Sequence, residues 1–250
     1  MKRLILLLFF IFSSILILAD IPNMIDEFDV AAKIANIEKK ALIIVFSSKD
    51  CYYCKLFESR VYPKAAVQTL IKNNYVFAEL YLGNNEHRVH FRGREFTNVQ
   101  FAQAFGVKGT PTFVFFTDTG TPITYYPGYS PENMFVKILK HLSQKLFEKG
   151  VEFKDYLKKK DGFVGKQVVI DLKSEKDAQF LVKNDPYIRV LKLGNEDKIE
   201  GKNIQIREKN IKKLDPYLRY IICKDSDGKR LLELLEKNGF LNIYLIHCKT

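Results

Sequence analysis

The chain has 250 residues, of which 47% are hydrophobic, and 40 Lys and Arg against 29 Asp and Glu give it a formal net charge of +11. This length predicts about two ordinary domains, and the 20 Phe and 13 Tyr exclude an intrinsically disordered chain. Four cysteines are too few for a small disulfide-built scaffold, so their positions indicate local chemistry.

The first 19 residues predict export. Lys2 and Arg3 precede an apolar run that ends at Leu18 and Ala19, which is the layout of a secretory signal peptide cleaved after Ala19. The run is short for the roughly 20 residues that span a bilayer, and an uncleaved N-terminal anchor is the alternative. We therefore expect a periplasmic protein without a nucleic-acid partner, whose scattered lysines form a solvated surface.

Residues 20–147 are predicted to form the first domain, in which helices and strands alternate. Apolar residues at helical spacing from Ile25 to Ala35 predict a helix, and apolar residues over 42–46 predict a buried strand. The remaining elements are expected as a helix over 51–60, a strand over 75–82, a helix over 98–105, a strand over 113–116 and a strand after the turn 118–121.

Cys51 and Cys54 lie in the first turn of the helix predicted over 51–60. Unpaired backbone N–H groups and the helix dipole favour a thiolate there, so Cys51 is the expected nucleophile. Cys54, one turn along, is placed to attack a mixed disulfide formed by Cys51. The alternatives are a buried free pair or half of a zinc site completed by His87 and His90, whose spacing does not match that of zinc fingers.

The segment from Met24 to Leu146 resembles the thioredoxin family. The resemblance is carried by the Cys-Tyr-Tyr-Cys sequence on a helix and by GVKGTPTFVFF, DTGTPI and PGYSPENMFVKILKHL. The closest patterns are those of exported thioredoxins of bacterial sulfur-compound oxidation and cytochrome maturation. The resemblance implies a cis Thr110–Pro111 bond facing the cysteines, with Thr110 pairing its backbone with a substrate strand. From composition alone, Pro111 could equally be a proline that starts a strand.

One position departs from this family, which carries a buried acid six residues before the first cysteine. Val45 occupies that position, so the usual proton acceptor for Cys54 is missing. Asp50, Glu58 or solvent would have to serve instead. Because the Tyr-Tyr dipeptide supplies no cation to Cys51, a reducing or intermediate couple is expected rather than a strongly oxidising one.

Residues 148–165, with the polar run 158–162, are predicted to be a linker, and residues 166–250 a second α/β domain. Its predicted elements are strands over 167–172, 187–193, 204–206, 217–222 and 242–246, and helices over 175–182 and 229–238. Alternation of this kind indicates a parallel sheet, with Cys223 and Cys248 at its carboxyl edge.

This second part resembles a degenerate rhodanese through VVIDLKSEKDAQFL and YIICKDSDGKRLLELLEKNGFLNIYLI. The resemblance implies that Cys223 forms a persulfide in the loop 224–230. The family's middle Gly-His-Ile-Pro-Gly-Ala motif is not visible, however, and the loop contains two acids. A non-transferring domain, a buried strand-end cysteine, or a structural disulfide between Cys223 and Cys248 are the alternatives. Pairing of these two cysteines requires their Cα atoms to lie within about 7 Å.

The expected fold class is thus α/β, a thioredoxin fold followed by a rhodanese-like parallel-sheet domain. The expected function is periplasmic thiol–disulfide oxidoreduction on disulfides or persulfides of exported partner proteins, recharged by a membrane electron donor, with no cofactor and no metal. The catalytic residues would be Cys51 and Cys54, the substrate-binding residues Thr110 and Pro111, and a second candidate site Cys223 and Cys248. The alternatives are a non-catalytic partner-binding module and a sulfurtransferase that uses Cys223. We also expect the two halves to be redox-coupled.

Overall fold

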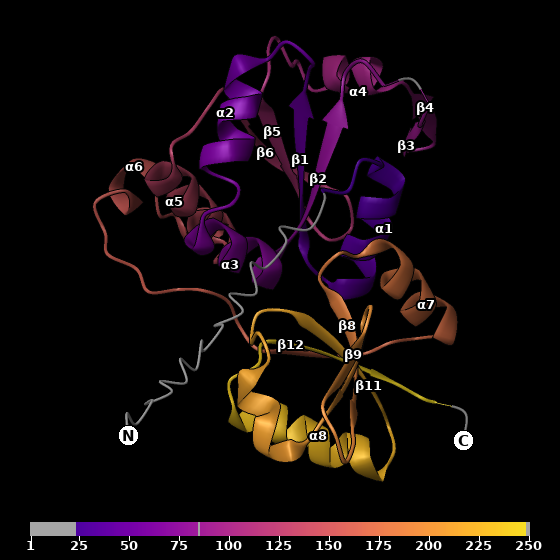
Figure 1. Ribbon diagram of the computed structural model, residues 1–250. Coiled ribbons are helices and arrows are strands. Elements are labelled where there is room, and N and C mark those ends of the chain that lie inside the picture. Colours follow the sequence, from indigo (N-terminus) through magenta and orange to yellow (C-terminus); the bar gives the residue numbers. More distant parts are fainter. Residues whose placement is uncertain (1–23, 85, 249–250) are drawn as a thin grey trace, which may run out of the picture.

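The computed structural model describes residues 24–84 and 86–248, and its first domain is built around a four-stranded sheet (Figure 1). The strand order is β2-β1-β5-β6, with β1 parallel to β2 and antiparallel to β5. In chain order the elements are α1 (Phe28–Glu38), β1 (Ala41–Ser47), α2 (Tyr52–Arg60), α3 (Ala65–Asn74), β2 (Tyr75–Tyr81), β3 (Val89–Phe91), β4 (Arg94–Phe96), α4 (Asn98–Ala104), β5 (Thr112–Phe116), β6 (Pro122–Pro127) and α5 (Glu132–Ser143).

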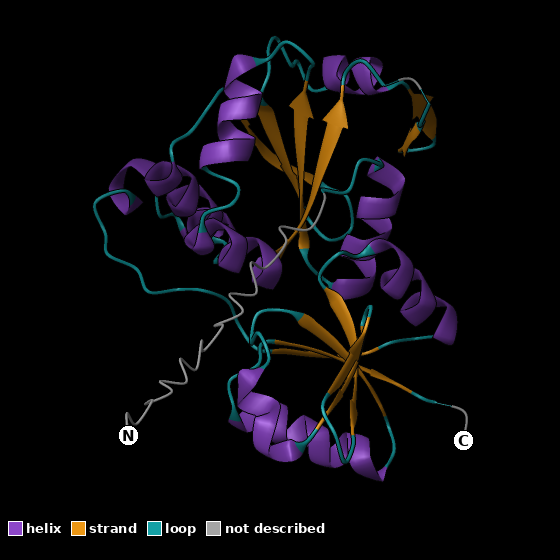
Figure 2. Ribbon diagram, in the orientation of Figure 1, coloured by secondary structure: helices purple, strands orange, loops and turns teal. Residues whose placement is uncertain are grey.

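Helices cover both faces of this sheet (Figure 2). Alternate residues of a strand point to opposite faces, so β1 sends Ile44 and Phe46 toward α1 and α4. The intervening Ile43 and Val45 pack with α2, α3 and α5. Every side chain of β5 is buried, as the apolar run over 113–116 predicts for a strand covered on both faces.

The predicted signal peptide over residues 1–19 lies outside the described residues. Within residues 24–84 and 86–248, no helix is long and apolar enough to cross a membrane.

The second domain contains a six-stranded sheet in the order β7-β12-β11-β8-β10-β9. Its first five strands are mutually parallel, as predicted, and only the edge strand β9 is antiparallel. Helix α7 covers one face, and α8 with a 3₁₀ helix covers the other. The elements are β7 (Val168–Asp171), α7 (Glu175–Asn184), β8 (Ile188–Leu193), β9 (Lys198–Glu200), β10 (Asn203–Ile206), η2 (Glu208–Lys213), β11 (Arg219–Cys223), α8 (Ser226–Lys237) and β12 (Asn242–Ile246).

The segment predicted as a linker is packed against α5. It begins within η1 (Leu146–Lys149) and contains α6 (Phe153–Tyr156), and Tyr156 is buried. The Tyr156 hydroxyl donates to the Asp161 carboxylate, which also accepts from Gln144 at 2.6 Å. The connection therefore has its own contacts, and the predicted domain boundaries stay predictions.

A buried charge cluster joins the two domains. Arg219, at the start of β11, is 1% exposed and lies against the carboxylates of Glu38 and Asp185, which are both 0% exposed. Its guanidinium also donates to the Tyr75 carbonyl at 2.6 Å, and Asn242 donates to Asn73 at 3.3 Å. Asp185 is the ionised partner of Arg219, whereas burial raises the pKa of Glu38 to about 8. Because an unpaired buried guanidinium is costly, this cluster fixes the relative position of the domains.

These contacts all lie at the amino ends of the parallel strands. Tyr75 begins β2, Arg219 begins β11 and Asn242 begins β12. The carboxyl ends of the two sheets therefore point away from each other, and α2 begins at the end of the first sheet that is remote from the second domain (Figure 1). At roughly 3.3 Å per strand residue, β1 and β11 together separate the two carboxyl edges by on the order of 30 Å.

Candidate active site

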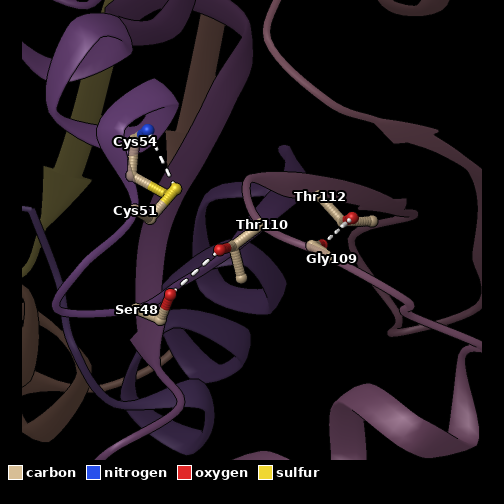
Figure 3. The surroundings of a disulfide bond; sticks show 6 residues. All are labelled: Ser48, Cys51, Cys54, Gly109, Thr110 and Thr112. Atoms are coloured by element: carbon tan, nitrogen blue, oxygen red, sulfur yellow. Dashed lines mark hydrogen bonds between the residues drawn. A yellow bond between two sulfur atoms is a disulfide. The ribbon is translucent and has the colours of Figure 1, made fainter.

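Cys51 and Cys54 form a disulfide where β1 passes into α2. Their Cα atoms are 5.3 Å apart, and Cys51 is the N-cap residue of the helix, as the sequence predicts. The Cys51 Sγ accepts a hydrogen bond from the Cys54 backbone N–H at 3.0 Å (Figure 3). Cys51 is 9% exposed and Cys54 4%, so the first cysteine is the more accessible of the two.

The loop before β5 faces this disulfide. The Thr110–Pro111 bond is cis, which confirms the prediction for that bond. The Thr110 hydroxyl lies 3.0 Å from the Ser48 hydroxyl, and this hydrogen bond joins the loop to the turn that carries Cys51 (Figure 3). The Ser48 carbonyl also accepts from the Cys51 N–H at 3.2 Å. Ser48 was not predicted as a site residue, although its place in the polar turn before Cys51 is visible in the sequence.

A groove of about 300 Å³ runs along this loop. It is lined by residues 106–112 together with Tyr125, Pro127 and Gly128. Beside the disulfide, Tyr52 and Tyr53 are 68% and 54% exposed, and the Tyr53 ring lies 6.0 Å from that of Tyr129. Exposed aromatic side chains therefore lie next to the disulfide, and such side chains bury a large apolar area when a partner contacts them.

The side chains of Glu58, on α2, and Glu79, on β2, lie next to each other. Glu58 is one turn beyond Cys54 on the helix, and burial together with the neighbouring Glu79 raises the pKa of Glu58. Glu58 is one of the proton acceptors that the sequence offers for Cys54, and Glu79 is not among them. The signal for Glu79 was a lone acid within the otherwise apolar strand over 75–82. Asp50, the other acid considered, is exposed beside Cys51.

The histidines of the zinc alternative bond to acidic groups. His90 Nδ1 lies 2.6 Å from Asp29, and its Nε2 lies 3.4 Å from Glu95. His87 lies 3.6 Å from Glu27, and both cysteines are occupied by their disulfide. Across residues 24–84 and 86–248, no group of three or more His, Cys, Asp or Glu side chains is arranged to hold a metal ion.

Cys223 and Cys248 form the second disulfide, with Cα atoms 5.5 Å apart, so the predicted pairing is present. Cys223 ends β11, and Cys248 follows β12 at the same edge of the sheet. The two carboxyl edges point in opposite directions, so the two disulfides of one chain lie apart, and the predicted redox coupling of the two halves stays a prediction.

Residues 28–143 match a family model described as a thioredoxin-like domain. The N-terminal domain has a thioredoxin fold. The match and the Cys51–Cys54 disulfide together support thiol–disulfide oxidoreduction by this domain. The match ends before the second sheet, so the rhodanese resemblance stays a prediction.

Among solved structures, the chain is similar to a thioredoxin-fold protein from Helicobacter pylori, with 20% identity over 52% of this chain and 95% of that one, at a TM-score of 0.43. It is also similar to a thioredoxin from Thermus thermophilus, with 22% identity over 51% and 92% and a TM-score of 0.42. The oxidised C-terminal domain of DsbD from Neisseria meningitidis matches with 13% identity over 48% and 98%, at a TM-score of 0.38. No curated protein matches the chain.

Proposed function

We propose that the chain is a periplasmic thiol–disulfide oxidoreductase that reduces disulfides or persulfides of exported partner proteins through Cys51 and Cys54. The observation that carries this proposal is the position of Cys51 at the start of α2, with its Sγ accepting the Cys54 N–H at 3.0 Å. When the disulfide is open, a sulfur in this position is favoured as the thiolate. The two cysteines thus have the unequal environments that sequential attack requires.

The reaction begins with both cysteines reduced. The Cys51 thiolate attacks one sulfur of the substrate disulfide, whose S–S bond breaks as a Cys51–substrate disulfide forms. The departing substrate sulfur leaves as a thiolate and takes a proton from solvent. Cys54 then loses its proton to a base and attacks the Cys51 Sγ, which re-forms the Cys51–Cys54 bond and releases the second substrate sulfur.

One turnover transfers two electrons to the substrate, so the Cys51–Cys54 disulfide must be reduced again. We propose a membrane electron donor for that step, in keeping with an exported protein. The groove beside Thr110 supports docking of an extended substrate segment, whose backbone would pair with the loop next to Cys51. The exposed Tyr52 and Tyr53 would contact apolar side chains of that segment.

Export is supported by the residues that precede the first domain, where Lys2 and Arg3 are followed by an apolar run to Ala19. Fractionation of cells that produce the tagged chain, with and without residues 2–19, tests this part. We expect the full chain outside the cytoplasm and the truncated chain inside it.

Trapping tests the reaction. A Cys54→Ala variant should accumulate a disulfide between Cys51 and its partner, because the resolving thiol is missing, and mass spectrometry identifies both chains. The same variant should lose disulfide reductase activity on a model protein disulfide, as should Cys51→Ala. Ser59→Ala is the matched control, since Ser59 is exposed on the same helix and bonds only to backbone carbonyls of that helix.

The alternatives give different outcomes in this experiment. A non-catalytic module that only holds partners would form no mixed disulfide and would not reduce the model substrate. A sulfurtransferase that uses Cys223 would transfer sulfur even when Cys51 is replaced. Loss of all thiol chemistry only in the Cys223→Ser variant would therefore overturn the assignment to Cys51 and Cys54.

A further inference from the structure

The Cys223–Cys248 disulfide lies in the wall of a pocket at the carboxyl edge of the second sheet. The pocket has a volume of about 230 Å³, and both sulfur-bearing residues line it together with Leu193, Asp225 and Asp227. Cys248 is exposed and Cys223 is half-buried. A small thiol or the thiol of a protein loop can therefore reach this disulfide without unfolding the sheet.

The two cysteines have different surroundings. The first turn of α8 abuts Cys223 so closely that a Cβ on Gly228 would stand 1.6 Å from the Cys223 carbonyl oxygen. Asp225 caps this helix, its carboxylate accepting the Gly228 N–H at 2.7 Å. The positive end of the helix dipole therefore lies next to Cys223, whereas Cys248 follows a strand and faces solvent.

The charges around the pocket are mixed. Lys224, next to Cys223, is paired with Asp171 at 2.7 Å, and Lys192 also lines the pocket. Asp225 and Asp227 oppose a negative charge on Cys223, so the helix dipole is the feature that favours a thiolate there. Of the two acids, Asp225 is the closer to Cys223 in sequence.

Strand pairing holds this edge together without the disulfide. Cys223 is the register partner of Ile246, and the Lys224 N–H donates to the Ile246 carbonyl at 2.8 Å. Opening the S–S bond would release only the segment after β12 from the sheet edge, because the ladder between β11 and β12 remains.

We propose that the Cys223–Cys248 disulfide is a second redox centre, which is opened by an incoming dithiol that attacks the exposed Cys248 sulfur. The dithiol belongs to another molecule, because the Cys51–Cys54 pair of the same chain lies at the opposite end of the protein. The donors are small dithiols and the reduced Cys51/Cys54 pair of a second copy, and the part that concerns the second copy rests on the function proposed above.

A thiolate of the dithiol forms a bond with the Cys248 Sγ, and the Cys223 Sγ leaves as a thiolate beside the start of α8 and takes a proton from solvent. The second thiol of the dithiol, once deprotonated, attacks its own sulfur partner in the mixed disulfide and releases Cys248. The dithiol loses two electrons and becomes a disulfide, and Cys223 and Cys248 end as thiols.

The test uses the full chain with Cys51→Ser and Cys54→Ser, so that only the second disulfide remains. This acceptor is treated under native conditions with dithiothreitol, and separately with 2-mercaptoethanol for a short time before quenching with acid. We expect reduction by dithiothreitol with an unchanged far-ultraviolet circular dichroism spectrum. With 2-mercaptoethanol we expect the adduct on Cys248, in at least tenfold excess over Cys223, by peptide mass spectrometry.

A charge variant separates direct exchange from opening through unfolding. Asp225→Asn keeps an N-cap side chain but removes the negative charge two residues from Cys223. We expect this variant to be reduced severalfold faster, because the negative charge of Asp225 no longer repels the departing Cys223 thiolate. A disulfide that opens only when the domain unfolds would respond to the stability of the domain and not to this charge.

The second donor is the chain with Cys223→Ser and Cys248→Ser, reduced at Cys51 and Cys54 and freed of small thiols. Mixed with the acceptor, it should reduce Cys223–Cys248 at a rate that scales with the product of both concentrations. Cys54→Ala in this donor should leave a Cys51–Cys248 disulfide between the two chains.

The experiments with dithiothreitol and with the second chain test the function of Cys51 and Cys54 separately from that of Cys223 and Cys248. A donor that reduces neither the acceptor nor a model protein disulfide contradicts the function proposed for Cys51 and Cys54, while reduction by dithiothreitol through Cys248 still supports the second centre. A donor that reduces the model disulfide but not the acceptor overturns exchange with a second copy. Resistance to dithiothreitol until the domain unfolds, or adducts on Cys223, overturns the second centre itself.

Discussion

Glu79 lies directly beside Val45, as its register partner on the neighbouring parallel strand. Register partners of parallel strands point to the same face of the sheet, and on this face Val45 packs with Phe57 of α2. The acid missing from position 45 therefore has a counterpart one strand away, on the face that α2 covers. Glu79 in turn lies next to Glu58, which is one turn beyond Cys54.

Removal of Glu79 should change the titration of Glu58. Burial and the Glu79 carboxylate raise the pKa of Glu58 above 4.5, so Glu79→Gln should move that pKa back toward 4.5. Because its pKa is raised on folding, Glu58 binds a proton more tightly in the folded state than in the unfolded state. The free energy of unfolding therefore falls as the pH rises from 4.5 through the folded pKa of Glu58. Thermal denaturation from pH 4 to 8 should thus show a flatter profile for Glu79→Gln than for the wild type.

The same variant tests proton transfer from Cys54. If the two carboxylates accept its proton, release of a trapped substrate should slow in Glu79→Gln and in Glu58→Gln, with a shifted pH profile. Glu132→Gln, which removes an acid from the first turn of α5, is the control. Unchanged profiles in both test variants would contradict a role for the pair.

Asp185→Asn should destabilise the protein strongly. It leaves Arg219 and Glu38 buried without the carboxylate that faces the guanidinium, and breaking a buried pair of this kind costs about 3 to 5 kcal/mol. Arg219 and hydrogen bonds hold the pKa of Asp185 below its usual range despite its burial. The depressed pKa contributes stability above pH 3.8 that is lost as the pH falls through the folded pKa.

The control for Asp185→Asn is Asp171→Asn, which breaks the exposed pair with Lys224. An exposed pair contributes about 0 to 1 kcal/mol, so denaturant unfolding should scarcely change. Equal losses in the two variants would show that the buried cluster does not hold the domains together.

After gentle reduction, Cys51 should be alkylated before Cys54. It is the more exposed of the two, and its sulfur is the one held at the helix start. Iodoacetamide labelling of the Cys223→Ser, Cys248→Ser protein at pH 7, followed by peptide mass spectrometry, gives the order directly. Faster labelling of Cys54 would reverse the roles assigned to the two cysteines.

Gly228→Ala should cost about 3 kcal/mol or require α8 to shift, because the new Cβ would meet the Cys223 carbonyl oxygen at 1.6 Å. Gly162→Ala is the matched control, since nothing lies within 4 Å of a Cβ at that position. Urea unfolding measures both. A Gly228→Ala protein as stable as Gly162→Ala would show that the start of α8 is less tightly placed than the structure has it.

His90 should titrate above its usual pKa of 6.5, because Asp29 bonds to its ring and Glu95 lies nearby. Asp29→Asn should lower that pKa. The charged imidazole favours the folded hairpin below pH 6.5, and this contribution is lost as the pH rises through the raised folded value. Proton NMR of the His90 imidazole resonances follows the titration in the wild type and in Asp29→Asn.

Sequence patterns predicted most of the strands and helices that bury an apolar face, and they placed Cys51 at a helix start. Strand β9 was missed because its residue Ile199 is 70% exposed, so the segment has no apolar face. The predicted start of α8 at residue 229 was three residues late, because the Asp225 cap was not recognised. The helix α3 and the hairpin of β3 and β4 were not predicted either.

The charge cluster between the domains had no sequence signal. Glu38, Asp185 and Arg219 are far apart in the chain, and each looks like an ordinary surface residue in its own segment. Glu79 stands out in the sequence as a lone acid in an apolar strand, but its relation to Val45 arises only when the two strands pair. Pairing across the chain, rather than local pattern, decides which charges become buried.

Arg219, on β11 of the second domain, donates a hydrogen bond to the Tyr75 carbonyl at the start of β2. Residues 24–147 by themselves therefore lack the side chain that covers the amino ends of their own strands. If the chain were cut between the two domains, Glu38 and the backbone carbonyl of Tyr75 would be exposed to water on one fragment. The Arg219 guanidinium would lose both partners on the other fragment. The two domains should therefore unfold in a single calorimetric transition. Either domain produced alone should be less stable than it is in the full chain, although each has its own sheet.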